Sequence, residues 1–166
     1  FGSKDGLLEA LLNRMIDEWH EREVAPALSS SPGRRALEHV LEGIRASAAR
    51  DPGAMRALYI LMFEGLQPSP EVLHSRMQSL HRKQRRLIER TVARGIADGS
   101  VSPEVGAQAA AILITSALRG AAYQWVLDPE FDFDAALQIL LDYIENSLAP
   151  KLVALDSTAG RPGIGQ

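Results

Sequence analysis

The stretch of sequence that decides the fold is SPEVGAQAAAILITSALRGAAYQWVLDP, residues 102–129. Between Val105 and Leu127 the only charged residue is Arg119. A helix that is apolar on one face is half buried, whereas a helix that is apolar on two opposite faces must be covered on both. We therefore expect an all-helical domain whose own chain covers one face of this helix and whose second copy covers the other. The two faces consist of Val105, Ala109, Ile112, Ser116, Gly120, Tyr123 and Leu127, and of Ala107, Ala110, Ile114, Ala117, Leu118, Ala121 and Trp125.

The composition limits the classes of protein to which the chain can belong. It has 166 residues, of which 46% are hydrophobic, and this suits one globular domain with its own core. It has no cysteine, so disulfides and zinc sites built on thiolates are excluded. The net charge of -3 argues against a nucleic-acid-binding surface, because phosphate binding needs a basic face.

The start of the chain and its most apolar run bear on its location. No basic segment followed by an apolar one begins the chain, so we expect a cytoplasmic protein without a signal peptide. Residues 105–127 are roughly long enough to span a bilayer. Arg119, Gln108 and Gln124 would be costly in lipid, however, and we expect no membrane partner. Because the chain begins with Phe1 rather than Met, we also expect further sequence upstream.

Helix starts are recognisable where a small polar residue, which caps the helix, precedes a proline, which fits its first turn. This pair occurs at Ser31-Pro32, Asp51-Pro52, Ser69-Pro70 and Ser102-Pro103. Ser3 and Asp132 are two further expected caps. No segment keeps the strict apolar alternation of a strand. The sequence therefore predicts six helices and no strand, over residues 4–24, 32–50, 52–66, 70–97, 102–128 and 133–149.

Two segments resemble those of one family of regulators. The opening residues Phe1-Gly2-Ser3-Lys4-Asp5-Gly6-Leu7-Leu8 resemble the Phe-x-Ser-Lys-x-x-Leu segment of the tetracycline-repressor (TetR) family. In that family, the segment begins the helix that links the helix-turn-helix to the ligand-binding core. The second segment is similar to the end of the eighth helix and the start of the ninth in many such regulators. It consists of Leu118-Arg119-Gly120, Gln124-Trp125, Leu127-Asp128-Pro129 and Phe131-Asp132.

The resemblance implies the C-terminal effector-binding and dimerisation domain of a DNA-binding transcriptional regulator, most often a repressor. Residues 1–155 would form this domain, with a disordered tail over 156–166. Residues 1–24 would be the helix linking it to a helix-turn-helix domain that is missing here, and the two such domains of a dimer would lie roughly 34 Å apart on operator DNA. The implied partners are a second copy, a small and largely apolar effector, and operator DNA. Lys4 resembles the family lysine that contacts a DNA phosphate, and both an ammonium group and a helix N-terminus favour a phosphate.

A pocket for the effector is expected between the helices predicted over residues 4–24, 52–66, 70–97 and 102–128. Methionine and aromatic side chains form an adaptable apolar wall, and a few polar groups orient a ligand. Gln84 is the most informative of these groups, because it falls in line with Leu80 and Leu87, where a polar group needs a partner. For each single residue, plain core packing is the alternative interpretation. The expected pocket residues are Trp19, Tyr59, Met62, Phe63, Met77, His81, Gln84 and Tyr123.

The helices predicted over residues 102–128 and 133–149 are expected to form a four-helix dimer interface between two subunits, because their apolar faces are too large to leave in water. Arg119 lies in an apolar context, so it must pair, reach solvent or meet an acidic ligand. We favour pairing or a place in the interface over a contact with the ligand. The expected interface residues are Ile112, Ser116, Arg119, Gly120, Tyr123, Leu137, Leu140, Leu141 and Ile144.

Two other classes of protein stay open. One is a helical dimerisation or adaptor module without a ligand, which a solid core without a pocket would favour. The other is a ferritin-like di-iron enzyme, because Glu71-x-x-His74 fits the local Glu-x-x-His pattern. Glu71, however, faces away from Leu73 and Met77, which would leave its carboxylate in water. We therefore expect no enzyme, no catalytic residue, no metal and no cofactor.

Overall fold

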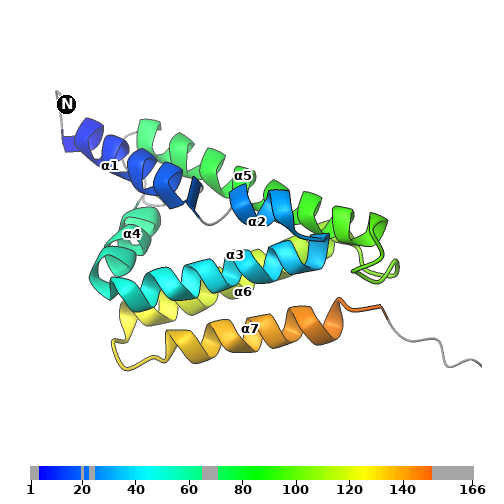
Figure 1. The fold of residues 1–166 in the computed structure, drawn as a ribbon. Helices are drawn as coiled ribbons and strands as arrows, with labels where there is room; N and C mark the ends of the chain where they lie inside the picture. The colour runs from blue at the N-terminus through cyan, green and yellow to red at the C-terminus, as the bar shows by residue number, and fades with distance from the viewer. Residues whose placement is uncertain (1–3, 20, 23–24, 65–70, 151–166) are drawn as a thin grey trace, which may run out of the picture.

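The computed structural model describes residues 4–19, 21–22, 25–64 and 71–150, and these residues contain no β-strand (Figure 1). The predicted all-helical class is therefore confirmed. The helices are α1 (Lys4–Trp19), α2 (Ala25–Ser30), α3 (Gly33–Arg50), α4 (Pro52–Glu64), α5 (Glu71–Ala97), α6 (Ala107–Leu127) and α7 (Phe133–Ser147). The predicted caps at Ser3 and Ser69-Pro70 and the predicted tail over 156–166 lie outside the described residues.

Helix α3 is the element with the most neighbours, and it packs against α2, α4, α5 and α7. Helix α6 packs against α4, α5 and α7, so the last two long helices lie side by side (Figure 1). Helix α1 packs against α4. The core is filled by apolar side chains from α3, α4, α5, α6 and α7 and from the turns beside them. Its largest fully buried side chains are Leu41, Val92, Val101, Ile114, Leu137, Ile144 and Leu148.

The N-terminus of α3 is tied to the turn that follows α5. The backbone N–H of Gly33 donates to Asp98 Oδ2 at 2.7 Å, and the next N–H donates to the hydroxyl of Ser100 at 3.1 Å. A Cβ atom on Gly33 would lie 2.1 Å from the backbone nitrogen of Gly95, so the two backbones are in direct contact. The prediction that Ser31 caps this helix is therefore wrong, because the cap comes from 65 positions further along the chain.

Two other predicted caps are confirmed by local hydrogen bonds. Asp51 Oδ1 accepts from the N–H of Ala54 at 2.9 Å in the first turn of α4. Asp132 Oδ1 accepts from the N–H of Ala135 at 2.9 Å in the first turn of α7. Each bond satisfies one of the N–H groups that a helix N-terminus leaves without a partner.

One helix start differs from the predicted one, and one helix was not predicted. Helix α6 begins at Ala107, and before it the N–H of Ser102 donates to the carbonyl oxygen of Leu148 at 2.8 Å, which holds these preceding residues against the end of α7. Helix α1 is described over Lys4–Trp19, and its predicted end at residue 24 lies outside the described residues. Pro26 then lies in the first turn of the additional helix α2, where the missing proline N–H costs no hydrogen bond.

The turn between α6 and α7 is held by stacked side chains. The rings of Trp125 and Phe133 are stacked with centroids 4.6 Å apart, and the Arg56 guanidinium lies 4.7 Å from the centre of the Trp125 ring. Arg56 also donates to the carbonyl oxygen of Pro129 at 3.2 Å. Aromatic stacking and a cation above an indole ring both stabilise such a contact. The segment with the second family resemblance therefore fixes the angle at which α7 returns along α6.

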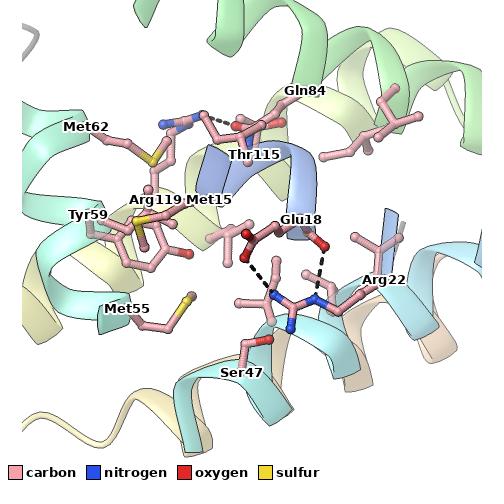
Figure 2. Close-up of a pocket in the computed structure, with 18 of the residues that line it drawn as sticks. Met15, Glu18, Arg22, Ser47, Met55, Tyr59, Met62, Gln84, Thr115 and Arg119 are labelled. Atoms are coloured by element: carbon pink, nitrogen blue, oxygen red, sulfur yellow. Dashed lines mark hydrogen bonds and ion pairs between the residues drawn. The ribbon is translucent and has the colours of Figure 1, made fainter. Parts of the chain in front are cut away.

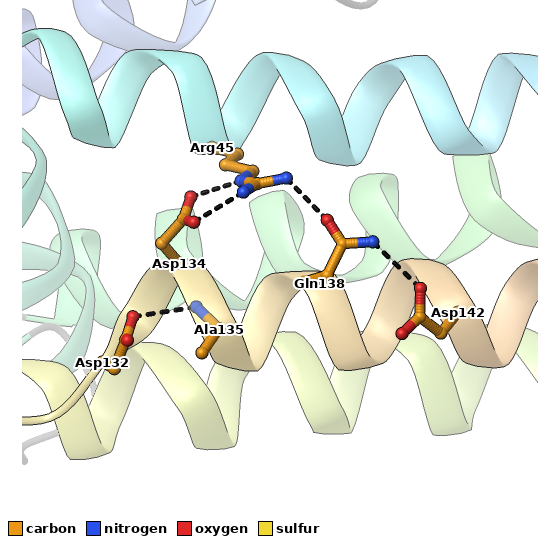
Figure 3. A network of polar contacts seen from close by, with 6 residues as sticks. All are labelled: Arg45, Asp132, Asp134, Ala135, Gln138 and Asp142. Carbon is orange, nitrogen blue, oxygen red and sulfur yellow. Dashed lines mark hydrogen bonds and ion pairs between the residues drawn. The ribbon is translucent and has the colours of Figure 1, made fainter.

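A polar network joins α3 to α7 on the outside of the bundle. Figure 3 shows the Arg45 guanidinium donating to both carboxylate oxygens of Asp134, and to Gln138 Oε1 at 2.6 Å. Gln138 in turn donates to Asp142 at 2.9 Å. The hydrogen bond from Arg45 lowers the pKa of the Asp134 carboxyl. These groups are exposed, so their contribution to stability is small, but the forked geometry fixes how the two helices are aligned.

In the single chain, one face of α6 is buried and the other is exposed. Ile114 and Trp125 point into the core, whereas Ile112 is 49% exposed and Tyr123 is 52% exposed. Leu127, at the end of the helix, is 65% exposed. None of the helices in the described part of the chain combines the length and the apolar character that a membrane span requires.

Helix α7 turns its apolar stripe inward. The four residues of this helix that were expected at the interface pack in the core of their own chain, so the part of α7 available to a second copy is its outer side. The exposed apolar residue of α7 is instead Ile139, at 70%. The inward-facing residues are Leu137, Leu140, Leu141 and Ile144.

Candidate ligand-binding site

A cavity of about 410 Å³ lies among α1, α3, α4, α5 and α6 (Figure 2). Its volume falls in the range of small-molecule sites. Most of the wall is apolar and includes Met15, Met55 and Met62, whose flexible side chains adapt to ligands of different shape. The other large aliphatic residues of the wall are Ile16, Leu37, Val40, Leu41, Ile44, Leu58, Leu87, Ile88, Ile114 and Leu118.

Polar side chains gather on two sides of the cavity. Figure 2 shows Gln84 and Thr115 close to the guanidinium of Arg119 on one side, which we call the arginine side. Glu18 and Arg22 lie with their hydrogen bonds on the other side, which we call the mouth because both residues are exposed. The two sides differ in how well their charges are paired.

The charge on the arginine side has only neutral partners. Arg119 NH2 donates to Gln84 Oε1 at 2.5 Å, and NH1 lies 3.5 Å from His81 Nε2. Burial lowers the pKa of Arg119 to about 10, which still leaves the guanidinium charged at neutral pH. Burial, and then the charges of Arg119 and Arg85, lower the pKa of His81 to about 4, so this imidazole is neutral at pH 7. Tyr59 is also neutral there, since burial raises its pKa to about 12.

Thr115 brings a further polar group to the arginine side. It stands one turn before Arg119 on α6, so both side chains lie on the same face of the helix. Its hydroxyl oxygen is buried and has no hydrogen-bond partner among the described residues. A buried hydroxyl without a partner is uncommon, because it loses water without a replacement.

The carboxylates at the mouth are already engaged. Glu18 Oε1 accepts from Arg14 at 2.8 Å, and Glu18 Oε2 lies 3.4 Å from Arg22. The hydrogen bond from Arg14 lowers the pKa of Glu18. Asp51, the other carboxylate of the lining, holds the cap of α4. The acidic groups of the lining therefore have partners of their own, unlike the charge of Arg119.

The structure places the predicted pocket residues in different environments. Tyr59, Met62 and Gln84 line the cavity. Phe63 lies against the rings of Tyr59 and Tyr123, with centroids 6.4 and 5.6 Å away, and neither Phe63 nor Tyr123 lines the cavity. Met77 is buried in the core, and His81 lies behind Arg119. The side chain of Trp19 is outside what the structure describes.

Several lining residues were not predicted. Arg119, which was expected at the dimer interface, lines the cavity. Helix α3 was not expected to contribute, yet it supplies Leu37, Leu41 and Ile44 to the wall. These residues recur at the spacing of one helical face, and that pattern identifies an inward stripe without saying whether a core or a cavity lies beneath it.

The pattern considered for a di-iron site gains no support. Among the described residues, no three side chains of His, Asp or Glu lie close enough together to hold a metal ion. His74 Nε2 lies 2.8 Å from the amide nitrogen of Gln78 on the next turn of α5. The side chain of Glu71 is outside what the structure describes.

The fold and the arrangement of its last two helices define an all-helical domain of the kind found at the C-terminal end of TetR-type regulators. The family described as BetI-type transcriptional repressor, C-terminal, matches residues 32–149. This match covers more than half of the chain, and the chain therefore belongs to that family. Membership indicates a role in effector binding or dimerisation within a transcriptional regulator. No curated protein and no solved structure matches the chain.

Proposed function

We propose that this chain is the effector-binding and dimerisation domain of a repressor that a small, largely apolar ligand releases from operator DNA. The observation that carries the proposal is the cavity itself, because α1 forms part of its wall through Met15 and Ile16. According to the family resemblance of residues 1–8, α1 is the helix that connects to the DNA-binding domain. A ligand in this cavity would therefore contact α1, the helix through which its binding can affect the DNA-binding domain.

The cavity also bears on the alternative of an adaptor module without a ligand. That alternative would be favoured by a solid core, whereas about 410 Å³ of space lies beneath α1. Leaving an apolar space unfilled costs stability, because the lining atoms lose packing contacts. The cost is understandable if the space is filled by a ligand during function.

Release from DNA requires that the ligand bind one arrangement of the domain better than the other. The ligand contacts α1 and α4 on one side and α5 and α6 on the other, so its size sets the distance between these helices. A shift of α1 changes the spacing of the two DNA-binding domains in the dimer. The coupling is reciprocal, so operator DNA weakens ligand binding by the same factor.

The test uses the full-length regulator that contains this chain, a labelled promoter fragment and fluorescence anisotropy during an effector screen. At least one small apolar compound should lower DNA affinity. Met55→Trp, which fills part of the cavity, should keep DNA binding and lose the response. Ile60→Trp is the matched control, since Ile60 is exposed on the same helix and does not line the cavity. DNA binding that stays the same across a broad screen would contradict the proposal.

Lys4 carries the proposed DNA phosphate contact, and its side chain is outside what the structure describes. A phosphate contact carries no sequence information. Lys4→Ala in the full-length regulator should therefore weaken binding to operator and unrelated DNA by a similar factor. Unchanged affinity for both would remove this part of the proposal.

The proposed dimer interface is the exposed face of α6 together with the outer side of α7. From the predicted set, Ile112, Ser116, Gly120 and Tyr123 are exposed in the single chain and available for it. A Cβ atom on Gly120 would meet nothing within 4 Å, so a partner helix can approach closely at this point. The interface would also include Leu113, Leu127 and Ile139, which are exposed apolar residues.

Light scattering at micromolar concentration tests the dimer. The wild-type chain should have twice the mass of 18.1 kDa. Ile112→Asp should yield the single-chain mass, because a charge cannot be buried without a partner. Ile60→Asp is the control, since Ile60 has a similar exposure on α4 and should leave the dimer intact. A wild-type monomer would refute the proposed interface.

A further inference from the structure

The strongest unexplained feature of the cavity is the charge of Arg119. The guanidinium is partly buried among α4, α5 and α6, and its hydrogen-bond partners are the neutral side chains of Gln84 and His81. Among the described residues, no carboxylate pairs with it. A cation removed from water without a counter-charge lowers stability.

The neighbouring groups cannot supply that counter-charge. Tyr59, which lies close enough to affect the pKa of Arg119, is neutral at pH 7, as is His81. Glu18 and Asp51 line the same cavity, but Glu18 is held by two arginines of its own segment and Asp51 caps α4. The missing negative charge has to come from outside the described chain.

The arginine side also holds more donors than acceptors. Gln84 accepts from Arg119 through Oε1, and a glutamine offers two N–H donors besides. The Thr115 hydroxyl has no partner. A guanidinium, an amide and a hydroxyl beside one another match the oxygens of a carboxylate, which accepts bonds from all three. The remaining wall, with its methionines and leucines, suits an apolar chain or ring.

We propose that the effector of this domain is a small monocarboxylate, whose carboxylate binds Arg119 and Gln84 while its apolar part fills the space between the methionines of α1 and α4. This inference rests on the proposed ligand-binding function and adds the sign of the ligand's charge to it. The carboxylate neutralises Arg119, and the apolar part joins α6 to α1 across the cavity.

The test compares three ligands with the same eight-carbon chain and different head groups, octanoate, 1-octanol and octylammonium, by isothermal titration calorimetry with the whole chain. Octanoate should bind about 10- to 100-fold more tightly than octanol, the factor expected for hydrogen bonds to a charged group. Octylammonium should bind most weakly, because it meets a like charge. Equal binding of octanoate and octanol, or tighter binding of octylammonium, would overturn the inference.

Variants locate the effect at Arg119. Arg119→Met should bring octanoate binding down to that of octanol, with both ligands measured on the same variant. Arg119→Lys, which keeps the charge, should retain a preference for octanoate, and it serves if the Met variant does not fold. Arg86→Met is the matched control and should leave the octanoate preference intact, since Arg86 is exposed on α5 and does not line the cavity. An octanoate preference that survives in Arg119→Met would refute the assignment.

A thermal measurement without ligand gives a second readout. If the charge of Arg119 has no partner in the free protein, Arg119→Met should raise the melting temperature of the unliganded chain while abolishing the rise that octanoate produces. A lower melting temperature would show that Arg119 is satisfied within the protein and would overturn the inference. Loss of the octanoate preference leaves the ligand-binding function intact, because the effector screen and Met55→Trp test that function separately.

Discussion

Two threonines offer a direct test of how the cavity affects stability. Thr91 on α5 is buried, and its hydroxyl donates to the carbonyl oxygen of Leu87 at 2.9 Å. Thr115 on α6 has a buried hydroxyl oxygen without a partner. Replacing each with valine keeps the branched shape and exchanges the hydroxyl for a methyl group. We expect the two substitutions to change the free energy of unfolding in opposite directions.

The magnitudes follow from the hydrogen bonds. A buried polar group without a partner costs about 1–3 kcal/mol, and a satisfied hydrogen bond contributes about 0.5–1.5 kcal/mol. Valine and threonine have similar helix propensities, so that difference is negligible. We expect Thr115→Val to raise stability by about 1 kcal/mol and Thr91→Val to lower it by about 1 kcal/mol. For a chain of this size, these changes correspond to shifts of about 2–4 °C in melting temperature.

The assay is urea unfolding followed by circular dichroism, with melting curves as a second measurement. All variants are compared at one protein concentration, because dimerisation makes the apparent stability depend on it. An equal dependence of the unfolding free energy on urea in the three proteins shows that the same surface is exposed on unfolding. Only the midpoint should then move.

One result would refute this reasoning about the arginine side. If Thr115→Val lowers stability as much as Thr91→Val does, the Thr115 hydroxyl has a partner in solution. The surplus of donors beside Arg119 would then be smaller than described above. A rise in stability together with weaker octanoate binding would instead show that the site sacrifices stability for ligand recognition.

Two further predictions concern the frame and the pH response. Gly33→Ala should lower stability by about 3 kcal/mol or more, because its Cβ would lie 2.1 Å from backbone atoms that cannot give way. Gly53→Ala, where a Cβ meets nothing nearer than 3.5 Å, should change stability little. Chemical denaturation of both variants checks this prediction. Acidification from pH 7 to pH 5 should lower the urea midpoint. The pKa of His81 is about 4 in the folded chain and has its ordinary value of 6.5 in the unfolded chain. In this pH range the imidazole is therefore protonated only in the unfolded chain, which stabilises the unfolded state. His81→Gln should make this part of the pH dependence disappear, and an unchanged slope would contradict it.

The parts of the fold that could be predicted are those set by local interactions. The caps at Asp51 and Asp132 act over three residues, so a short pattern is enough to identify them. The cap of α3 depends on Asp98, 65 positions away, and no pattern near Ser31 contains it. The predicted start of α6 at Ser102 differs from the observed start at Ala107, and the bond of Ser102 to the distant carbonyl of Leu148 is likewise absent from any local pattern.

The site was predictable only in its residue types. A helical wheel indicates that α6 is apolar on two faces, and it does not say which neighbour each face meets. Arg119 was therefore assigned to the interface, whereas the structure turns it toward Gln84. Tyr59 and Met62 were recognised because methionine and aromatic stripes are common to cores and pockets. Phe63 and Met77 have the same character and lie outside the cavity, and only the packing of several helices distinguishes the two groups.

The close crossing of α3 and α5 restricts how the molecule can respond to an occupant. Helix α3 is joined to α5 by the contact of Gly33 with Gly95 and to α7 by the pairing of Arg45 with Asp134, and we call these three helices the three-helix frame. Helix α1 packs against α4 and is not part of this three-helix frame. We therefore expect a ligand that widens the cavity to displace α1, while the three-helix frame keeps its arrangement.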